Sequence, residues 1–388
     1  MPTLAVTVTP TFTNDLTSFS INMPTTGSKE VIIPVGIKSF KVYDDGGATG
    51  EHSKNCSGTL KLKAPTGYVL QLSGNVTVNT GWSSLQVYDG DNLNADRVLT
   101  GVSNPSGTLT AINTVVSSGQ NMTLYFYSGS TQYDGLDLTV TVVKVMALAD
   151  NADNSEDIGS WNGGLANVTL AGRTLTKDGK WNTLCLPFAV TAAQMAETTH
   201  PLYGATIKKL DATNTSLNTS TGALTLSFTA TTSIEAGKPY IVKWTTTGDA
   251  ISNPVFNGVT ISNAVAAEVE SNDQNVKFVG QYSPFAIDDS NKEAILYIGS
   301  ANKIGYSSKA RTLKSCRAHF WVKPNDNGTP AARMISIDFG EGEVTGITTT
   351  DLTDSTDKAG TCYDLQGRKV TKPQKGLYIV NGKKVVIK

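Results

Sequence analysis

The stretch that decides the fold class of this chain is Leu136-Asp137-Leu138-Thr139-Val140-Thr141-Val142. Apolar and polar residues alternate with a period of two, so the apolar side chains from Leu136 to Val142 project to one face of an extended strand. One packed face and one wet face are typical of a strand in an antiparallel sheet. The stretch therefore predicts a β-sandwich.

Strand-like segments of this kind recur from end to end, each bounded by Gly, Asn, Asp or Pro. The clearest are Lys38–Tyr43, Leu85–Tyr88, Met122–Tyr127, Trp181–Val190, Pro239–Trp244 and Arg317–Val322. The best helix candidate is Thr191–Glu197, with Thr191 as its N-cap. The pattern predicts an all-β protein of tandem antiparallel β-sandwich domains with a short C-terminal β tail.

Two polar, turn-rich breaks divide the 388 residues, a length that accommodates two or three domains. The predicted organisation is an N-terminal strand segment or the remnant of a preceding domain (1–32), a first β-sandwich (33–148), a linker (149–164), a second β-sandwich (165–343), a second linker (344–360) and a C-terminal β segment (361–388).

The composition argues against several function classes. Charged residues make up 17% of the chain and the net charge is -1, which does not suit a nucleic-acid-binding or polybasic membrane-surface protein. No apolar run reaches the length of a transmembrane segment, and no signal peptide is recognisable after Met1. The four cysteines form no CxxC pair and the three histidines have no metal-ligand spacing.

Three blocks, Val42–Gly47, Leu85–Gly90 and Leu124–Ser128, make residues 33–144 similar to a bacterial CUB-like β-sandwich, with a jelly-roll-like architecture. Residues 166–339 resemble an accessory β-domain of surface and secreted proteins of Bacteroidota type. The segments that carry this second resemblance are Trp181–Phe188, Ala236–Tyr240, Asn253–Phe256 and Arg317–Phe320. No activity follows from it.

The end of the chain, with Tyr363–Arg368, Gly376–Tyr378 and Lys383–Val385, resembles a C-terminal sorting domain of the type IX secretion kind. This resemblance implies export across an outer membrane, followed by release or attachment. The expected location is therefore secreted or on the outer-membrane surface.

The CUB resemblance raises the question of calcium, because many CUB domains hold Ca²⁺ with acidic side chains. The three matching positions are Ser83, Gly129 and one near Asn79 or Thr80, and none of them carries a carboxylate. Loop carboxylates that could instead converge on a cation are Asp44, Asp45, Asp89, Asp91 and Asp134. The alternative is that these Asp residues stabilise turns. No other cofactor is expected.

Exposed aromatic rings can stack on sugar faces, and Trp82 and Trp161 lie in turn-like sequence. Tyr125, Tyr127 and Tyr133 could extend a binding face near the same loops. The alternative is ordinary core packing, which we expect for Trp181 and Trp321.

No catalytic constellation is visible. Cys316 and His319 are three residues apart and would face opposite sides of a strand, which argues against an activated Cys/His pair. The sequence does not decide whether Cys185 and Cys316 form a disulfide. The sequence therefore favours a secreted or cell-surface, non-catalytic binding or adhesion protein that recognises a glycan or a protein. The alternatives are the accessory C-terminal region of a larger exported hydrolase (glycosidase or peptidase) and an adhesive surface-assembly component.

Overall fold

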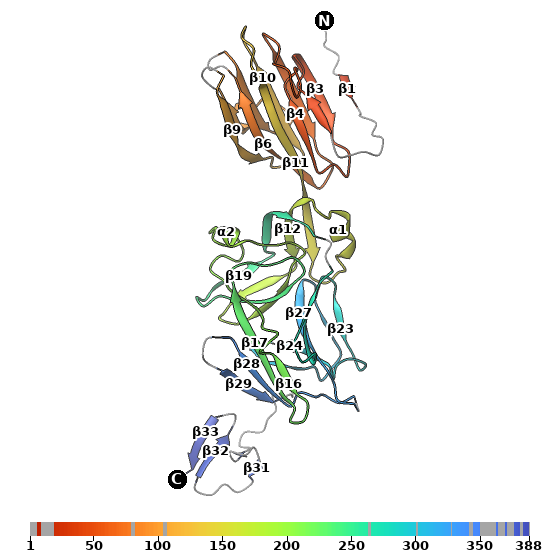
Figure 1. Cartoon of the computed structure of the whole chain (residues 1–388), viewed down its shortest axis with the longest axis vertical. Coiled ribbons are helices and arrows are strands. Elements are labelled where there is room, and N and C mark those ends of the chain that lie inside the picture. Colours follow the sequence, from red (N-terminus) through yellow and green to blue (C-terminus); the bar gives the residue numbers. More distant parts are fainter. Residues whose placement is uncertain are drawn as a thin grey trace.

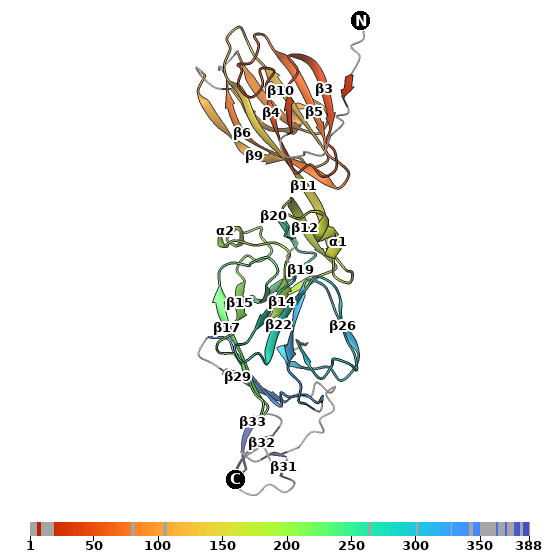
Figure 2. The ribbon, with the colours of Figure 1, turned by 45° about the vertical axis from the view of Figure 1, so that its right-hand side comes forward.

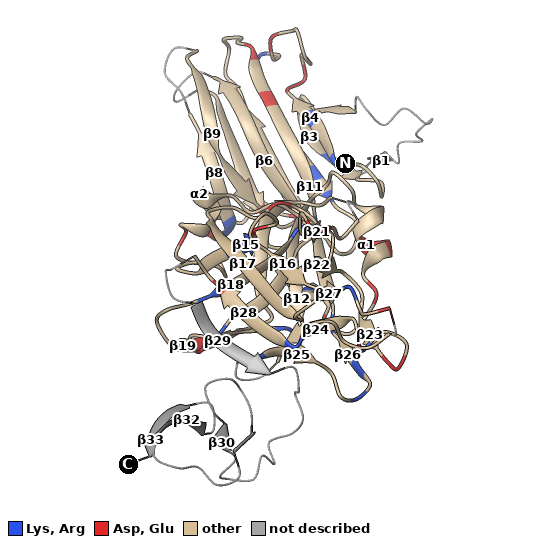
Figure 3. Ribbon diagram, turned by 60° about the horizontal axis from the view of Figure 1, so that its bottom comes forward, with Lys and Arg blue, Asp and Glu red and all other residues tan. Residues whose placement is uncertain are grey.

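The structure, a computed structural model, describes residues 19–78, 82–103, 107–262, 265–299, 302–326 and 328–340, together with the backbone of β1 (Val6–Val8) and of the strands after residue 343. Strands dominate this part of the chain (Figure 1), which confirms the all-β prediction. No helix in the described part is long and apolar enough to cross a membrane. Figure 3 marks the acidic and basic residues along the ribbon, where they occur at scattered positions on the described strands and loops.

The first sandwich packs two sheets face to face, with strand orders β1-β3-β5-β10-β7-β8 and β2-β4-β11-β6-β9. Its further strands are β2 (Ser20–Asn22), β3 (Thr26–Ile32), β4 (Ser39–Tyr43), β5 (Ser57–Lys63), β6 (Tyr68–Thr77), β7 (Ser84–Asp89), β8 (Val98–Val102), β9 (Leu109–Val116), β10 (Asn121–Tyr127) and β11 (Gly135–Ala149), with a 3₁₀ turn at Ala95–Arg97. Because β2 and β3 pair with β4 and β5, this sandwich begins before residue 33, the predicted boundary.

Strand β11 shows the predicted alternation. The side chains of Leu136, Leu138, Val140 and Val142 are buried in the core between the sheets. On the opposite face, Asp137 forms an ion pair with Lys41 of β4 at 2.6 Å. The backbone of β6 approaches β11 so closely that a Cβ at position 74 would lie 2.4 Å from the carbonyl oxygen of Asp137, so this position requires glycine.

The same strand leads out of the first sandwich into the second unit (Figure 2). Residues 144–149 of β11 pair in parallel with β12 (Leu165–Ala171), and β12 pairs with β20 (Val255–Thr260). The connection between β11 and β12 contains α1 (Ser155–Ser160), and both Ile158 and Trp161 are buried in a core that continues from the first sandwich. The segment predicted as a linker, 149–164, is therefore a packed part of the fold.

The second unit contains a sheet of order β14-β18-β15-β17-β28-β29, with β16 beside β17, and a sheet of order β21-β22-β27-β24-β25. Two strand pairs, β13-β19 and β23-β26, complete it. The bounds are β13 (Thr174–Lys177), β14 (Asn182–Cys185), β15 (Thr206–Leu210), β16 (Ser216–Asn218), β17 (Ala223–Thr231), β18 (Pro239–Lys243), β19 (Gly248–Ser252), β21 (Glu268–Glu270), β22 (Val276–Gln281), β23 (Phe285–Ile287), β24 (Ile295–Ile298), β25 (Ile304–Tyr306), β26 (Arg311–Leu313), β27 (Arg317–Val322) and β28 (Met334–Asp338).

The core of this unit contains a cluster of three phenylalanines: Phe278 and Phe320 stack with ring centroids 4.6 Å apart, and Phe228 meets both edge-on. Helix α2 (Ala192–Met195) begins at the predicted N-cap, because the Thr191 side chain accepts from the Gln194 backbone N–H in a capping box. Trp181 is buried as expected, whereas Trp321 is half-buried.

Beyond residue 343, β29 (Val344–Thr349) pairs with β28, so the predicted linker 344–360 begins as a strand of the second unit. The rest of that linker lies outside the described residues. Within the predicted C-terminal segment, the backbone forms one four-stranded sheet from β30 (Cys362–Tyr363), β31 (Lys369–Val370), β32 (Gly376–Val380) and β33 (Lys383–Ile387).

Candidate functional site

Three aromatic side chains line the outer face of the first sandwich where β7 and β10 pair. Tyr127 lies opposite Ser84, and two further pairs along this register would set Gly129 opposite Trp82. A Cβ at Gly129 would in fact lie 3.1 Å from the Trp82 Cβ. Residues directly opposite one another point to the same face, so Trp82 and Tyr127 are diagonal neighbours on the solvent side.

Tyr125 continues this arrangement along β10. Leu124 and Phe126, which alternate with Tyr125 and Tyr127 along β10, are buried in the core, so the two tyrosines face outward. We call Trp82, Tyr127 and Tyr125 the aromatic row. Trp82 is 67% exposed and Tyr127 41% exposed, whereas Tyr125 is half-buried.

The residues directly opposite Tyr125 and Tyr127 on the flanking strands are polar and uncharged, whereas Lys61, opposite Thr123, lies diagonal to Tyr125 on the same face. The Tyr125 hydroxyl lies 3.2 Å from the Ser57 Oγ, which fixes the ring at one end. Thr59 and Gln86 lie opposite Tyr125 on the two flanking strands, and Ser84 lies opposite Tyr127. The row therefore combines flat apolar surfaces with hydroxyl and amide groups.

The two other aromatic candidates are placed differently. Tyr133 is half-buried in a loop, where a Cβ on Gly107 would lie 2.2 Å from its ring. Trp161 is only 2% exposed, and its indole N–H donates to the Leu165 carbonyl at 2.8 Å. The expectation that Trp161 is an exposed platform is therefore wrong, because its ring fills the core beside Tyr68.

Three of the five candidate carboxylates, Asp44, Asp45 and Asp89, accept hydrogen bonds from backbone N–H groups of the chain; Asp89 accepts from Ser118 at 2.8 Å. Asp44 is fully buried and accepts from the backbone N–H groups of Gly46 and Leu136, both at 2.8 Å. Burial raises the pKa of Asp44. Burial also acts to raise the pKa of Asp45, but hydrogen bonds from Ser53 and Thr25 outweigh it, so the pKa of Asp45 is lowered.

The five carboxylates do not converge. Asp44, Asp45 and the exposed Asp134 lie at the end of the sandwich where β11 begins, whereas Asp89 lies opposite Met122 at the other end of β10. A strand of that length spans about 20 Å. Asp91 follows Asp89 on the same loop. No group of three His, Cys, Asp or Glu side chains in the described residues could hold a metal ion, and the calcium prediction for this set is wrong.

Cys316 and His319 form no catalytic pair. The His319 Nδ1 lies 2.8 Å from the Gln281 Oε1 and its ring stacks on Phe285, and burial lowers the pKa of His319 to about 4. Burial raises the pKa of the Cys316 thiol to about 12. Cys316 and Cys185 are neighbours, since the Cys185 N–H donates to the Cys316 carbonyl at 3.3 Å, but both thiols are free.

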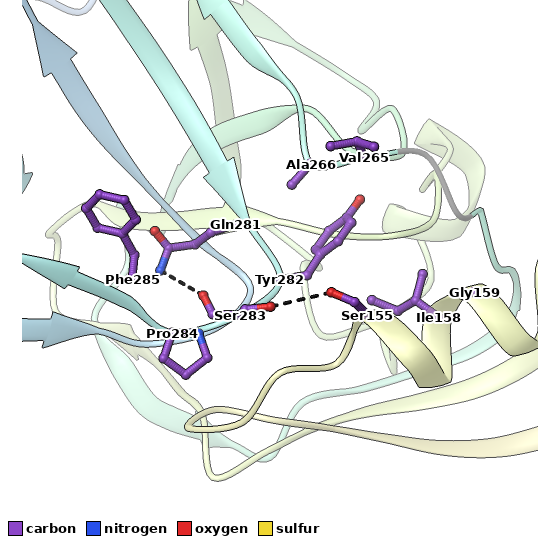
Figure 4. A pocket seen from close by; sticks show the side chains of 10 residues that line it. All are labelled: Ser155, Ile158, Gly159, Val265, Ala266, Gln281, Tyr282, Ser283, Pro284 and Phe285. Carbon is purple, nitrogen blue, oxygen red and sulfur yellow. Dashed lines mark hydrogen bonds between the residues drawn. The ribbon is translucent and has the colours of Figure 1, made fainter.

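A pocket that sequence reasoning missed lies between α1 and the turn from β22 to β23 (Figure 4). It encloses about 510 Å³, within the range of small-ligand sites. Its walls are mainly apolar and include Ile158, Tyr282 and Phe285. The Gln281 amide in the wall is already satisfied, since it donates to the Lys314 carbonyl at 2.8 Å. No local motif announces this pocket, because its walls come from distant segments.

A cluster of charged residues next to β11, in which Asp150 and Arg173 are buried, was also missed. Asp150 accepts from Arg317 at 2.8 and 2.9 Å and from Lys314 at 2.9 Å. Arg173, 1% exposed, donates to the carbonyls of Cys316 and Thr183. Burial, assisted by the nearby Arg317, lowers the pKa of Arg173 to about 9. The cluster ties the end of β11 to the start of β27.

No protein-family model matches the sequence, and no curated protein is similar to it. Among solved structures, the CUB1-EGF-CUB2 domains of rat MASP-1 match with a TM-score of 0.26 and 11% identity, over 78% of this chain and 97% of theirs. The corresponding human MASP-1/3 domains give a TM-score of 0.23 and 10% identity, over 76% and 96%. The extracellular region of zebrafish Gpr126/Adgrg6 gives 0.25 and 11%, and the match covers 85% of this chain but 36% of that region. At this level the similarities assign neither a family nor a function.

Proposed function

We propose that this chain is an extracellular, non-catalytic recognition protein that binds a neutral glycan on the aromatic row. The observation that carries the proposal is the 67% exposed indole of Trp82 beside Tyr127 on one sheet face. Exposing a large apolar ring to water is unfavourable, and a ligand that stacks on the ring covers this apolar surface and so gains free energy of binding.

The hydroxyl and amide groups directly opposite Tyr125 and Tyr127 favour a sugar as the ligand, and Lys61 lies at the β10 N-terminal end of the row. A sugar ring presents an apolar face of C–H groups and a rim of hydroxyls. Tyr127 and Trp82 offer the flat surfaces, and Ser57, Ser84 and Gln86 offer hydrogen-bond partners around them. Because Tyr125 and Tyr127 sit on the paired strand β10, little conformational entropy is lost at these two rings on binding, whereas Trp82 lies in the turn that precedes β7.

The test is binding of the full chain to a glycan array, followed by calorimetry with the best hit. Trp82→Ala and Tyr127→Ala should each weaken binding about tenfold or more, as expected for an aromatic anchor. The matched control is Tyr203→Ala, because Tyr203 is an exposed aromatic residue of the second unit. A blank array at high micromolar protein, or affinities indifferent to both substitutions, would count against the proposal.

Export is the second part of the proposal and rests on the resemblance of residues 361–388 to a sorting domain. Deleting these residues should abolish export in a host with a type IX system and leave the two larger units folded. Unaltered export of the truncated chain would contradict it. The accessory region of a larger exported hydrolase remains the alternative, and turnover of a polysaccharide or peptide by this chain alone would contradict the non-catalytic assignment.

A further inference from the structure

Strand β9 is a long edge of the first sandwich. It pairs with β6 on one side, and no other strand in the described residues pairs with it. Its sequence is Leu109-Thr110-Ala111-Ile112-Asn113-Thr114-Val115-Val116. Edge strands are usually protected by charged side chains, proline, short length or a bulge. Strand β9 has eight residues, no charge and no proline, and a bulge is its one protective feature of this kind.

A bulge in β9 decides which of its side chains share a face. Leu72 and Gly74 of β6 lie opposite Val115 and Ile112, so three steps on β9 match two on β6. Residues seven apart, such as Leu109 and Val116, would lie on opposite faces of a regular strand. With the extra residue, both lie on the solvent face, where Leu109 is 67% exposed and Val116 41% exposed.

We infer that β9 pairs antiparallel with β9 of a second copy of this chain, about a two-fold axis at the bulge. The axis that sets Leu109 opposite Val116 of the second copy also sets Ala111 opposite its Thr114. The two-fold axis forms this Leu109–Val116 contact twice in each dimer, so both exposed apolar side chains of each copy are paired. This self-complementarity is what a two-fold interface requires, and it favours a second copy over an unrelated strand.

We expect the affinity of this dimer to be low. The bulge interrupts the ladder at the centre, so hydrogen bonding is confined to a short segment on either side of it. The apolar contribution comes from two Leu–Val pairs. We therefore expect reversible, concentration-dependent association rather than a permanent dimer.

The inference goes beyond the proposed function and does not depend on it. A β9 dimer would carry two copies of the aromatic row, one on each sandwich, and so raise the avidity for a ligand with repeated units. Association of the free protein is measured without any glycan, so either proposal can fail while the other stands.

The test is sedimentation velocity of the full chain from low micromolar to near-millimolar concentration, with Leu109→Lys, Val116→Glu and the double variant. Each single substitution sets a charge against an apolar side chain twice per dimer and should weaken association about tenfold or more. The double variant sets Lys against Glu twice and should recover association. Val98→Lys is the control, since Val98 is exposed on β8, the edge of the other sheet.

Circular dichroism of every variant checks that the fold is retained, which the exposure of both positions predicts. A wild-type chain that is monomeric at every concentration overturns the inference, even if the edge accepts a strand from another protein. The β9 register is overturned if neither single substitution weakens dimerisation. It is also overturned if the double variant dimerises no more tightly than either single variant.

Discussion

Mild acid should destabilise the second unit through one buried histidine. His319 is 2% exposed, packed against Phe285, and bonded to the Gln281 side chain. The Gln281 Nε2 donates to backbone carbonyls, so its Oε1 faces His319 and the Nδ1 of the ring must carry the proton. Protonating the other nitrogen would create a charge in the core.

The magnitude follows from the two pKa values. Burial lowers the pKa of His319 from 6.5 to about 4, so the unfolded chain takes up the proton first as the pH falls. The stabilising effect is fully present above pH 6.5 and is lost between pH 6.5 and 4. At 1.36 kcal/mol per pH unit the loss is about 3 kcal/mol.

The measurement is urea unfolding of wild type and His319→Gln, followed by tryptophan fluorescence, at pH 7 and pH 4.5. The stability difference between the two proteins should shrink or reverse at the lower pH, because glutamine does not titrate. Thr312→Gln, exposed on β26, should follow wild type at both values. A wild-type-minus-variant difference that is the same at both pH values would falsify the assignment of His319 as the acid-labile group.

Three further outcomes are expected. Asp150→Ala should cost about 2 kcal/mol in urea unfolding, because it removes the charged hydrogen bonds from Arg317 and Lys314; an unchanged midpoint would show that the ion pair is dispensable. Cys56, Cys185 and Cys316 are buried and free, so Ellman's reagent should react with them only after denaturation; fast labelling of the native protein would contradict this. Added calcium should leave the unfolding temperature unchanged, whereas a rise of several degrees would reveal a cation site.

Local sequence patterns predicted the secondary structure well. The alternation from Leu136 to Val142 gave a strand with the expected buried face, and Thr191 caps α2 as proposed. Both signals are carried by neighbours in the sequence, which is why they could be read without coordinates. Trp161 shows where local patterns fail to predict burial. Its polar, turn-rich surroundings suggested a linker, but at the end of α1 its ring packs against Tyr68 and is buried.

For the candidate binding residues too, some features could be predicted from the sequence and others depended on the tertiary structure. Exposure of Trp82 was foreseeable from its turn-like surroundings, but its alignment with Tyr127 depends on the pairing of β7 with β10. The sequence grouped the five carboxylates because each lies in loop-like sequence. In the structure Asp44, Asp45 and Asp134 lie at one end of the sandwich and Asp89 and Asp91 at the other, because the strands that lead to these loops run in opposite directions. The contact between Asp150 and Arg317 joins residues 167 positions apart and has no local signature.

By itself the sequence determined an all-β chain, because side-chain period and turn residues act over a few positions. Tertiary structure alone decided that β11 continues from the first sandwich into the second unit, and which aromatic rings stay in water. It also decided that β9 ends a sheet with Leu109 and Val116 on one face. Burial and strand pairing bring together residues far apart in the chain, and the alternation pattern within any one strand is the same whichever partner it finds.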